Sequence, residues 1–331
     1  MSASGGEHEP RRLVARRLCT PWRRGPNLIT SPPRPRGLAL WWYAARPRTL
    51  SLAATPVLCG GALAWHAGHP MATLTWVVTL ATALLIQMGT NLFNDAADAG
   101  SSDGPGRIGP LRVTAAGWAP AEAVRHAALV CFAGALAGGI YLVMAGGWPI
   151  LVIGAASLAA GWAYSAGPRP LSHTAWGEVW VLAFFGLAAV AGSQALQGLR
   201  PGAPALLVGL ALGAMGAAVL LVNNLRDREA DQAAGRRTLA ATVGDRSARR
   251  LYAALVMAPF PLLLGLGWLE GEVLRMWPLL LALPVNLGLA CRFRLLPVGP
   301  AMNEQLARTA QAQLLVGVLL SLALLARVPT A

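Results

Sequence analysis

The acidic side chains of this chain gather in two short stretches, and each stretch directly follows a long apolar segment. The first covers residues 91–112 and the second covers residues 223–239. Together they contain six of the 14 aspartates and glutamates, namely Asp95, Asp98, Asp103, Asp227, Glu229 and Asp231. Carboxylates at the end of a membrane-length segment are costly unless a function uses them. The pattern therefore predicts a site that needs several carboxylates.

Helical spacing places the polar residues of each stretch on one face, because residues three or four apart lie on the same side of an α-helix. In the first stretch the residues so spaced are Asn91, Asn94, Asp95 and Asp98. In the second they are Asn224, Asp227 and Asp231. Two such acidic faces at one membrane level would repel each other. Mg²⁺ removes this repulsion, and it typically binds one or two carboxylates together with substrate phosphate oxygens.

Arginines follow both acidic stretches and fit the same kind of ligand. Arg107 and Arg112 follow the aspartates of the first stretch, and Arg236 and Arg237 follow those of the second. A guanidinium offers paired donors that match a phosphate group. Either stretch by itself could be a solvated helix end that is acidic by chance. The repeated pattern favours one shared site for a divalent metal and a diphosphate, with Glu229 off the face and solvated.

The composition excludes an ordinary soluble protein. The chain has 331 residues, of which 55% are hydrophobic and 12% are charged, whereas soluble domains carry about 25% charged residues. Apolar runs of about 20 residues recur, which is the length of a membrane-spanning helix. The four cysteines form no CxxC pair, so no disulfide framework or zinc site is predicted.

Nine membrane helices are predicted, and the two acidic stretches follow the second and the sixth. They cover residues 48–66, 72–95, 122–144, 148–165, 176–196, 204–225, 248–268, 275–292 and 308–327. We count 24 of the 27 basic residues, all arginines, before the first helix or beside the even-numbered loops. The positive-inside rule then places the N-terminus and both acidic stretches in the cytoplasm. Residues 1–36, rich in Arg and Pro, are predicted to be a disordered tail, and residues 37–331 the membrane domain.

Two further polar residues lie in apolar surroundings. Glu178 begins the fifth predicted helix, where the helix dipole favours an acid, and an active-site role is the alternative. Gln87 lies one turn before Asn91, and faces either the cavity or a neighbouring helix.

Three segments of the chain resemble the UbiA superfamily of membrane prenyltransferases, and its menaquinone branch in particular. They are NDAAD with Asp103 and RIGPLR, NNLRDREADQAAGRRTL, and YSAGPRPLSHTAWGEVWVLAFFG. The resemblance covers roughly residues 40–327. The chain departs from the branch pattern at Ala96, where Tyr is usual, at Arg236, where Lys is common, and in a shorter spacing between Asp98 and Asp103.

The resemblance implies roles for individual residues. The first metal–diphosphate site would use Asn94, Asp95, Asp98 and Asp103, and the second would use Asn224, Asp227 and Asp231. Diphosphate oxygens would be held by Arg107, Arg112 and Arg236. The nine helices would surround a central cavity with a cap of cytoplasmic loops. Tyr164 and Arg169 would line this cap, and Asn91 would join the substrate-binding residues.

The resemblance also implies the reaction and the surroundings. A polyprenyl group would pass from polyprenyl diphosphate to the aromatic acceptor 1,4-dihydroxy-2-naphthoate, with Mg²⁺ as cofactor and loss of CO₂. The setting would be a bacterial cytoplasmic (inner) membrane, with the lipid bilayer as partner and no nucleic acid. Another aromatic acceptor, 4-hydroxybenzoate or homogentisate, is the alternative. A carboxylate-coupled transporter is disfavoured, because transporter carboxylates are expected near the midplane of the bilayer.

Overall fold

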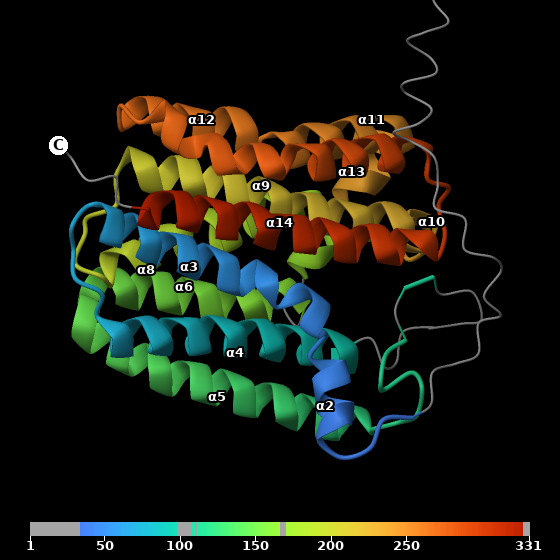
Figure 1. Cartoon of the computed structure of the whole chain (residues 1–331). Coiled ribbons are helices and arrows are strands. Elements are labelled where there is room, and N and C mark those ends of the chain that lie inside the picture. The colour runs from blue at the N-terminus through green and yellow to red at the C-terminus, as the bar shows by residue number, and fades with distance from the viewer. Residues whose placement is uncertain (1–33, 98–107, 110, 166–169, 327–331) are drawn as a thin grey trace, which may run out of the picture.

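The computed structural model describes residues 34–97, 108–109, 111–165 and 170–326. Across these ranges the chain forms helices joined by turns and loops, with no strand. Figure 1 shows the long helices lying side by side, with their axes along a common direction. The all-helical class predicted from the apolar runs is confirmed. Most of the predicted tail, residues 1–36, lies outside the described ranges, so that domain boundary stays a prediction.

The helices of the first half of the chain are α2 (Leu38–Ala44), η1 (Pro47–Thr49), α3 (Ser51–His66), α4 (Thr73–Ala97), α5 (Ala121–Gly146), α6 (Trp148–Ser165) and η3 (Leu171–His173). They continue with α7 (Gly177–Leu182), the π-helix η4 (Ala183–Ala188), α8 (Ala189–Ala195), α9 (Ala203–Arg226) and α10 (Arg228–Ala233). The last are α11 (Leu239–Met257), α12 (Pro259–Leu269), η5 (Val273–Leu281), α13 (Leu283–Leu295) and α14 (Ala301–Leu325).

Among the described residues, six helical segments are long and apolar enough to cross a membrane. They are α4, α5, α7 to α8, α9, α11 to α12, and α14. The pair η5 and α13, bent by 50°, would be a seventh. The protein is therefore a multi-pass membrane protein, but the predicted count of nine is not confirmed. The difference lies in α3, which has 16 residues, and in the apolar part of α6, because both are shorter than the roughly 20 residues of a full span.

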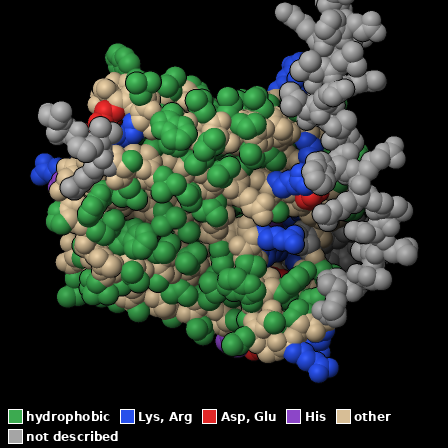
Figure 2. Space-filling view, viewed as in Figure 1, with side chains coloured by type: hydrophobic (Ala, Val, Ile, Leu, Met, Phe, Trp, Pro, Cys, Tyr) green, Lys and Arg blue, Asp and Glu red, His purple; other side chains and the backbone are tan. Residues whose placement is uncertain are grey.

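The outer surface of the bundle is apolar. Val130, Met144 and Leu274 are each more than 70% exposed, and Figure 2 shows hydrophobic side chains covering most of one face. Arginines gather at one end of that face, on the right of the view. Exposed apolar side chains of this kind suit contact with lipid hydrocarbon rather than water. The helices also satisfy their own backbone hydrogen bonds, as a membrane environment requires.

Helix α9 is the centre of the bundle. In its membrane-length window 78% of residues are buried, against 22% for α4 and for α5. Its glycines let the backbone of α9 approach α7 and η4 closely. A Cβ on Gly213 would lie only 2.7 Å from the Leu182 carbonyl oxygen of α7 and 3.1 Å from the Gly186 Cα of η4.

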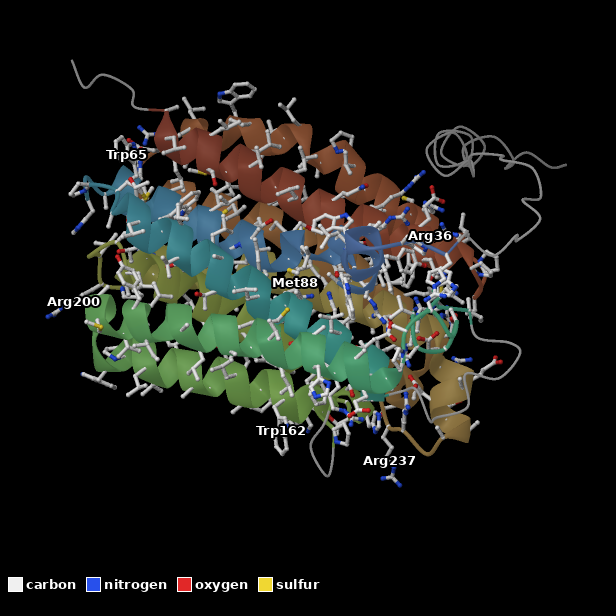
Figure 3. The ribbon with its side chains drawn as sticks, turned by 90° about the horizontal axis from the view of Figure 1, so that it is seen from below. Arg36, Trp65, Met88, Trp162, Arg200 and Arg237 are labelled. Carbon is white, nitrogen blue, oxygen red and sulfur yellow. The ribbon has the colours of Figure 1, made fainter. Side chains whose placement is uncertain are left out.

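The two helices that lead into the acidic stretches end at the same end of the bundle. Figure 1 shows the C-terminal ends of α4 and α9, with α10 beyond α9, on the right. In Figure 3, Arg36 and Arg237 lie at that end, while Arg200 and Trp65 lie at the opposite end. The fold thus brings together two stretches more than 100 residues apart in the sequence.

Candidate active site

A cavity of about 1260 Å³ opens between the two acidic stretches and continues into the bundle. Nine predicted site residues line it, namely Asn91, Asn94, Asp95, Arg112, Tyr164, Asn224, Asp227, Asp231 and Arg236. Arg237, which was expected beside Arg236 at the same ligand, does not line it. Four other predicted residues, Asp98, Asp103, Arg107 and Arg169, lie outside the described ranges. The prediction that the two stretches share one cavity therefore agrees with the structure for the residues described.

Asp95 holds the loop that follows the first stretch. Its Oδ2 accepts a hydrogen bond from the Val113 backbone N–H at 3.1 Å, and its Oδ1 accepts from the Thr114 backbone N–H at 3.1 Å. The Thr114 hydroxyl lies 2.6 Å from the same Oδ1. Asp95 is only 2% exposed, so burial of this carboxylate is balanced by three donors from one loop. Arg112, the preceding residue of that loop, lines the cavity.

Asn91 connects α4 to the segment between α2 and α3. Its Nδ2 donates to the Ala45 carbonyl oxygen at 2.8 Å, with the Thr49 hydroxyl at 3.4 Å. That segment carries Arg46 and Arg48, both of which line the cavity. Asn91 thus has a positioning contact that its predicted substrate-binding role did not include.

The second stretch is joined to the first through a buried arginine. Arg226, 3% exposed, donates from Nε and Nη2 to the two carboxylate oxygens of Asp227, at 2.8 and 2.5 Å. Its Nη1 donates to Asn303 Oδ1 at 2.7 Å, and its Nη2 also donates to Asn223 Oδ1 at 2.8 Å. The Asn303 amide in turn donates to the Ile108 carbonyl oxygen at 2.8 Å. One hydrogen-bond network therefore joins α9 and α14 to Ile108 of the first stretch.

Asp231 lies one turn beyond Asp227, and its backbone N–H donates to the Asp227 carbonyl at 2.9 Å. Burial raises the pKa of Asp231 to about 6, and the nearby Arg236 offsets part of this rise. The Arg236 Nη1 lies 3.4 Å from Asp231 Oδ1. Such a buried carboxylate would gain from a cation at the cavity, because a cation would repay the cost of ionising it.

Glu178 lies in the first turn of α7, where the helix dipole favours an acid, but its side chain turns inward. It is 4% exposed, and its Oε1 accepts a hydrogen bond from Asn224 Nδ2 at 2.9 Å. Glu178 therefore fixes the orientation of an asparagine that lines the cavity.

Sequence reasoning missed several residues at this end of the cavity. Arg46, Arg48, Asn223, Arg226 and Asn303 all line it. From the sequence, Arg46 and Arg48 contributed only to the positive-inside rule. In the structure they flank Pro47 at η1, directly before α3. Asn303 carried no motif at all, and only its contacts to Arg226 and Ile108 reveal it.

The cavity is polar at one end and apolar beyond it. Arginines and aspartates from both stretches line the polar end, so positive side chains outnumber negative ones there among the described residues. The remaining wall is mostly hydrocarbon and includes Ile86, Leu136, Ile140, Leu158 and Phe184. This arrangement fits an anionic head group attached to a long apolar tail.

A divalent metal fits the second stretch better than the described part of the first. Asp227, Asp231 and Asn224 present oxygens to one cavity, which is the donor type that Mg²⁺ prefers. The carboxylate of Asp95 is already occupied by its loop. In the described ranges no three His, Cys, Asp or Glu side chains are grouped closely enough to hold a metal by themselves, so a substrate phosphate would have to complete the coordination.

Comparison with known sequences finds relatives that are similar over most of the chain. The sequence profile of the UbiA prenyltransferase family matches residues 53–300. The 1,4-dihydroxy-2-naphthoate octaprenyltransferase of Mycobacterium tuberculosis is 36% identical over 267 residues, which cover 78% of this chain and 90% of that protein. The Escherichia coli protein of the same name is 36% identical over 287 residues, covering 84% and 92%.

Comparison with solved structures gives the same architecture. A UbiA homolog from Archaeoglobus fulgidus, solved bound to DMAPP and Mg²⁺, has a TM-score of 0.60 with this chain at 16% identity. The match covers 87% of this chain and 99% of that one. The shared feature at this level of identity is the fold.

Proposed function

The chain belongs to the UbiA prenyltransferase family, and we propose that it transfers a polyprenyl group from polyprenyl diphosphate to 1,4-dihydroxy-2-naphthoate. The products would be demethylmenaquinol, CO₂ and diphosphate, which makes this a step of menaquinone biosynthesis. The names of its relatives, similar over most of both chains, support this acceptor. The observation that carries the proposal is the cavity, which joins a charged end to an apolar interior.

The charged end would hold the diphosphate. Arg46, Arg48, Arg112 and Arg236 approach it from three segments of the chain, and a guanidinium pairs well with phosphate oxygens. Arg226 is already engaged with Asp227 and two asparagines. We assign to it the positioning of Asp227 rather than direct contact with the substrate.

Asp227 and Asp231, with Asn224 beside them, are the described residues that would hold Mg²⁺. Each oxygen of Asp227 accepts one hydrogen bond from Arg226 and keeps a second lone pair for a cation. Bound there, the metal would stabilise the negative charge that develops on the departing diphosphate. Asp98 and Asp103 remain predicted ligands of the same diphosphate.

The protein's own residues would orient the two substrates and exclude water. The C–O bond of the allylic diphosphate breaks while the arginines hold the leaving anion. The electron-rich ring then forms the new C–C bond, and loss of CO₂ restores its aromaticity. The allylic carbon carries positive charge during this step, so water in the cavity would destroy it. The apolar wall, with residues such as Ile140, Leu158 and Phe184, keeps water away and accommodates the tail.

We also propose that the charged end faces the cytoplasm of a bacterium, with the chain in its cytoplasmic membrane. The arginine-rich end seen in Figure 2 is the end that holds the cavity mouth, and the positive-inside rule assigns such an end to the cytoplasm.

The test is an assay of the purified protein with Mg²⁺ and farnesyl diphosphate, analysed by mass spectrometry. The protein is offered 1,4-dihydroxy-2-naphthoate and 4-hydroxybenzoate in parallel, with and without excess EDTA. A prenylated naphthoquinol without the carboxylate, formed only when divalent metal is present, is the expected product. Product from 4-hydroxybenzoate alone would overturn the acceptor, and product in excess EDTA would overturn the metal requirement.

A further inference from the structure

Gln87 is a buried amide on the cavity wall with an unsatisfied oxygen. It lies on α4 one helical turn before Asn91, is 7% exposed, and lines the cavity. Its Oε1 is fully buried and has no hydrogen-bond partner among the described residues. A buried polar atom left without a partner costs about 1–3 kcal/mol, and in an apolar membrane cavity no bulk water compensates for it. Gln87 differs from other such amides, for example Gln194, in that it lines the cavity, where a ligand could supply the missing donor.

Other polar side chains on the same face of α4 are satisfied by the protein. The Thr90 hydroxyl donates to the Ile86 carbonyl at 2.9 Å, and the Thr79 hydroxyl donates to the Thr75 carbonyl at 2.7 Å. The Asn91 amide binds the Ala45 carbonyl. Gln87 lies between these residues on α4, and its Oε1 alone has no hydrogen-bond partner among them. The missing partner is therefore specific to this position.

The depth of Gln87 separates it from the diphosphate. Asn94 lies seven positions after Gln87, which corresponds to about 10 Å along a helix. Met88, the next residue, is labelled in Figure 3 and lies partway between the arginine-rich end and the end of Arg200. The polyprenyl tail that reaches this depth is hydrocarbon, and an ionised diphosphate has no hydrogen to donate.

We propose that Gln87 Oε1 accepts a hydrogen bond from a ring hydroxyl of the aromatic acceptor, and so selects the acceptor. This rests on the proposed function, in which the acceptor is the substrate that brings hydroxyl donors. Its carboxylate, being anionic, is drawn to the arginines at the cavity mouth, and its ring then extends towards Gln87. Gln87 is a specificity-determining residue, and it takes no part in diphosphate departure.

Gln87→Met tests this, because methionine has nearly the same length and volume but cannot accept a strong hydrogen bond. Losing one hydrogen bond raises the KM for 1,4-dihydroxy-2-naphthoate about five- to tenfold. The KM for farnesyl diphosphate stays within about twofold of wild type, because hydrocarbon and diphosphate contacts are unchanged. Gln87→Asn, which withdraws the amide by one methylene, gives the same selective rise.

Gln194→Met is the matched control. Gln194 is 2% exposed and its Oε1 is also buried without a partner, but it does not line the cavity. A purely structural effect of removing a buried amide would appear in both variants. The expected result is that Gln194→Met leaves both KM values at the wild-type level.

Acceptor analogues identify the hydroxyl. 1-Hydroxy-2-naphthoate and 4-hydroxy-2-naphthoate each lack one ring hydroxyl, and both are tested as inhibitors. The analogue without the recognised hydroxyl inhibits wild type and Gln87→Met equally, whereas the other loses about five- to tenfold in potency against the variant.

The outcomes separate the two levels of the proposal. Wild-type turnover of dihydroxynaphthoate with equal effects on both KM values, or with equal effects of the Gln87 and Gln194 variants, would overturn the Gln87 subsite alone. Absence of turnover by the folded wild-type protein would overturn the proposed function, and the subsite with it.

Discussion

Thr114→Val isolates the role of Asp95 in holding the loop. The substitution removes the hydroxyl that lies 2.6 Å from Asp95 Oδ1 but keeps the side-chain shape. The backbone donors of Val113 and Thr114 to the carboxylate remain. Asp95 itself is untouched and stays available to any metal or substrate. A change in activity would therefore come from the loop and from Arg112, which the loop carries to the cavity.

The expected magnitude follows from this one hydrogen bond. A hydrogen bond to a charged group contributes about 1.5–3 kcal/mol, and the lower end applies because this contact is partly exposed to the cavity. About 1.4 kcal/mol corresponds to a tenfold change in an equilibrium. The KM for the prenyl diphosphate should rise about tenfold, with the acceptor KM unchanged, because the displaced group is an arginine at the diphosphate end.

Steady-state kinetics with each substrate varied in turn would measure this split. Thr242→Val is the control, since the Thr242 hydroxyl donates to the Thr238 carbonyl at 3.0 Å on α11, at an exposed position. Wild-type kinetics for Thr114→Val, combined with complete loss of activity in Asp95→Asn, would refute the loop-holding role and leave Asp95 as a direct ligand.

Two further substitutions and one pH series test the second stretch. Asp231→Asn should abolish turnover yet raise the free energy of unfolding at pH 7 by on the order of 2 kcal/mol, because burial raises the pKa of Asp231 to about 6 and its ionised form is costly; thermal unfolding that shows no gain would contradict this. For the same reason the Mg²⁺ concentration needed for half-maximal turnover should increase as the pH falls below about 6, while the stability from this group increases from about pH 6 down to about pH 4; an unchanged Mg²⁺ requirement from pH 7 to pH 5 would count against Asp231 as a ligand. Asn303→Ala should raise the KM for the prenyl diphosphate about tenfold, because it breaks the link from Arg226 to Ile108, and equal effects on both substrates would argue for a general loss of structure instead.

The sequence was sufficient to predict that two distant stretches meet. Spacing by three and four residues grouped the polar side chains of α4. The single helical face expected for Asn224, Asp227 and Asp231 was wrong, because α9 ends at Arg226 and Asp231 lies on α10. The repetition of acid and arginine predicted a shared ligand. Because helix ends at one membrane level can be brought together by any compact bundle, this part of the site depended little on tertiary detail. The described residues of both stretches do line one cavity.

Partners chosen by tertiary contact could not be predicted in this way. Arg226 reads in the sequence as a charge at a helix C-terminus, where solvent exposure is the ordinary expectation. Its burial depends on Asn303, 77 positions further along the chain. Asp95 likewise reads as a ligand until its contacts to Val113 and Thr114 are known. The left-handed conformation of Gly244 (φ 78°) divides α11.

The pairing of Arg226 with Asp227 reconciles an acidic site with an anionic ligand. Without a cation, Asp227 and Asp231 would stand one turn apart beside a cavity for diphosphate, and repulsion would favour protonation of one of them. The rise in the pKa of Asp231 shows that burial already pushes in this direction. The guanidinium of Arg226 holds Asp227 by both oxygens, so one carboxylate keeps its orientation while the other remains able to exchange a proton for a metal. Metal and diphosphate would then bind most tightly together, since each removes the charge that opposes the other.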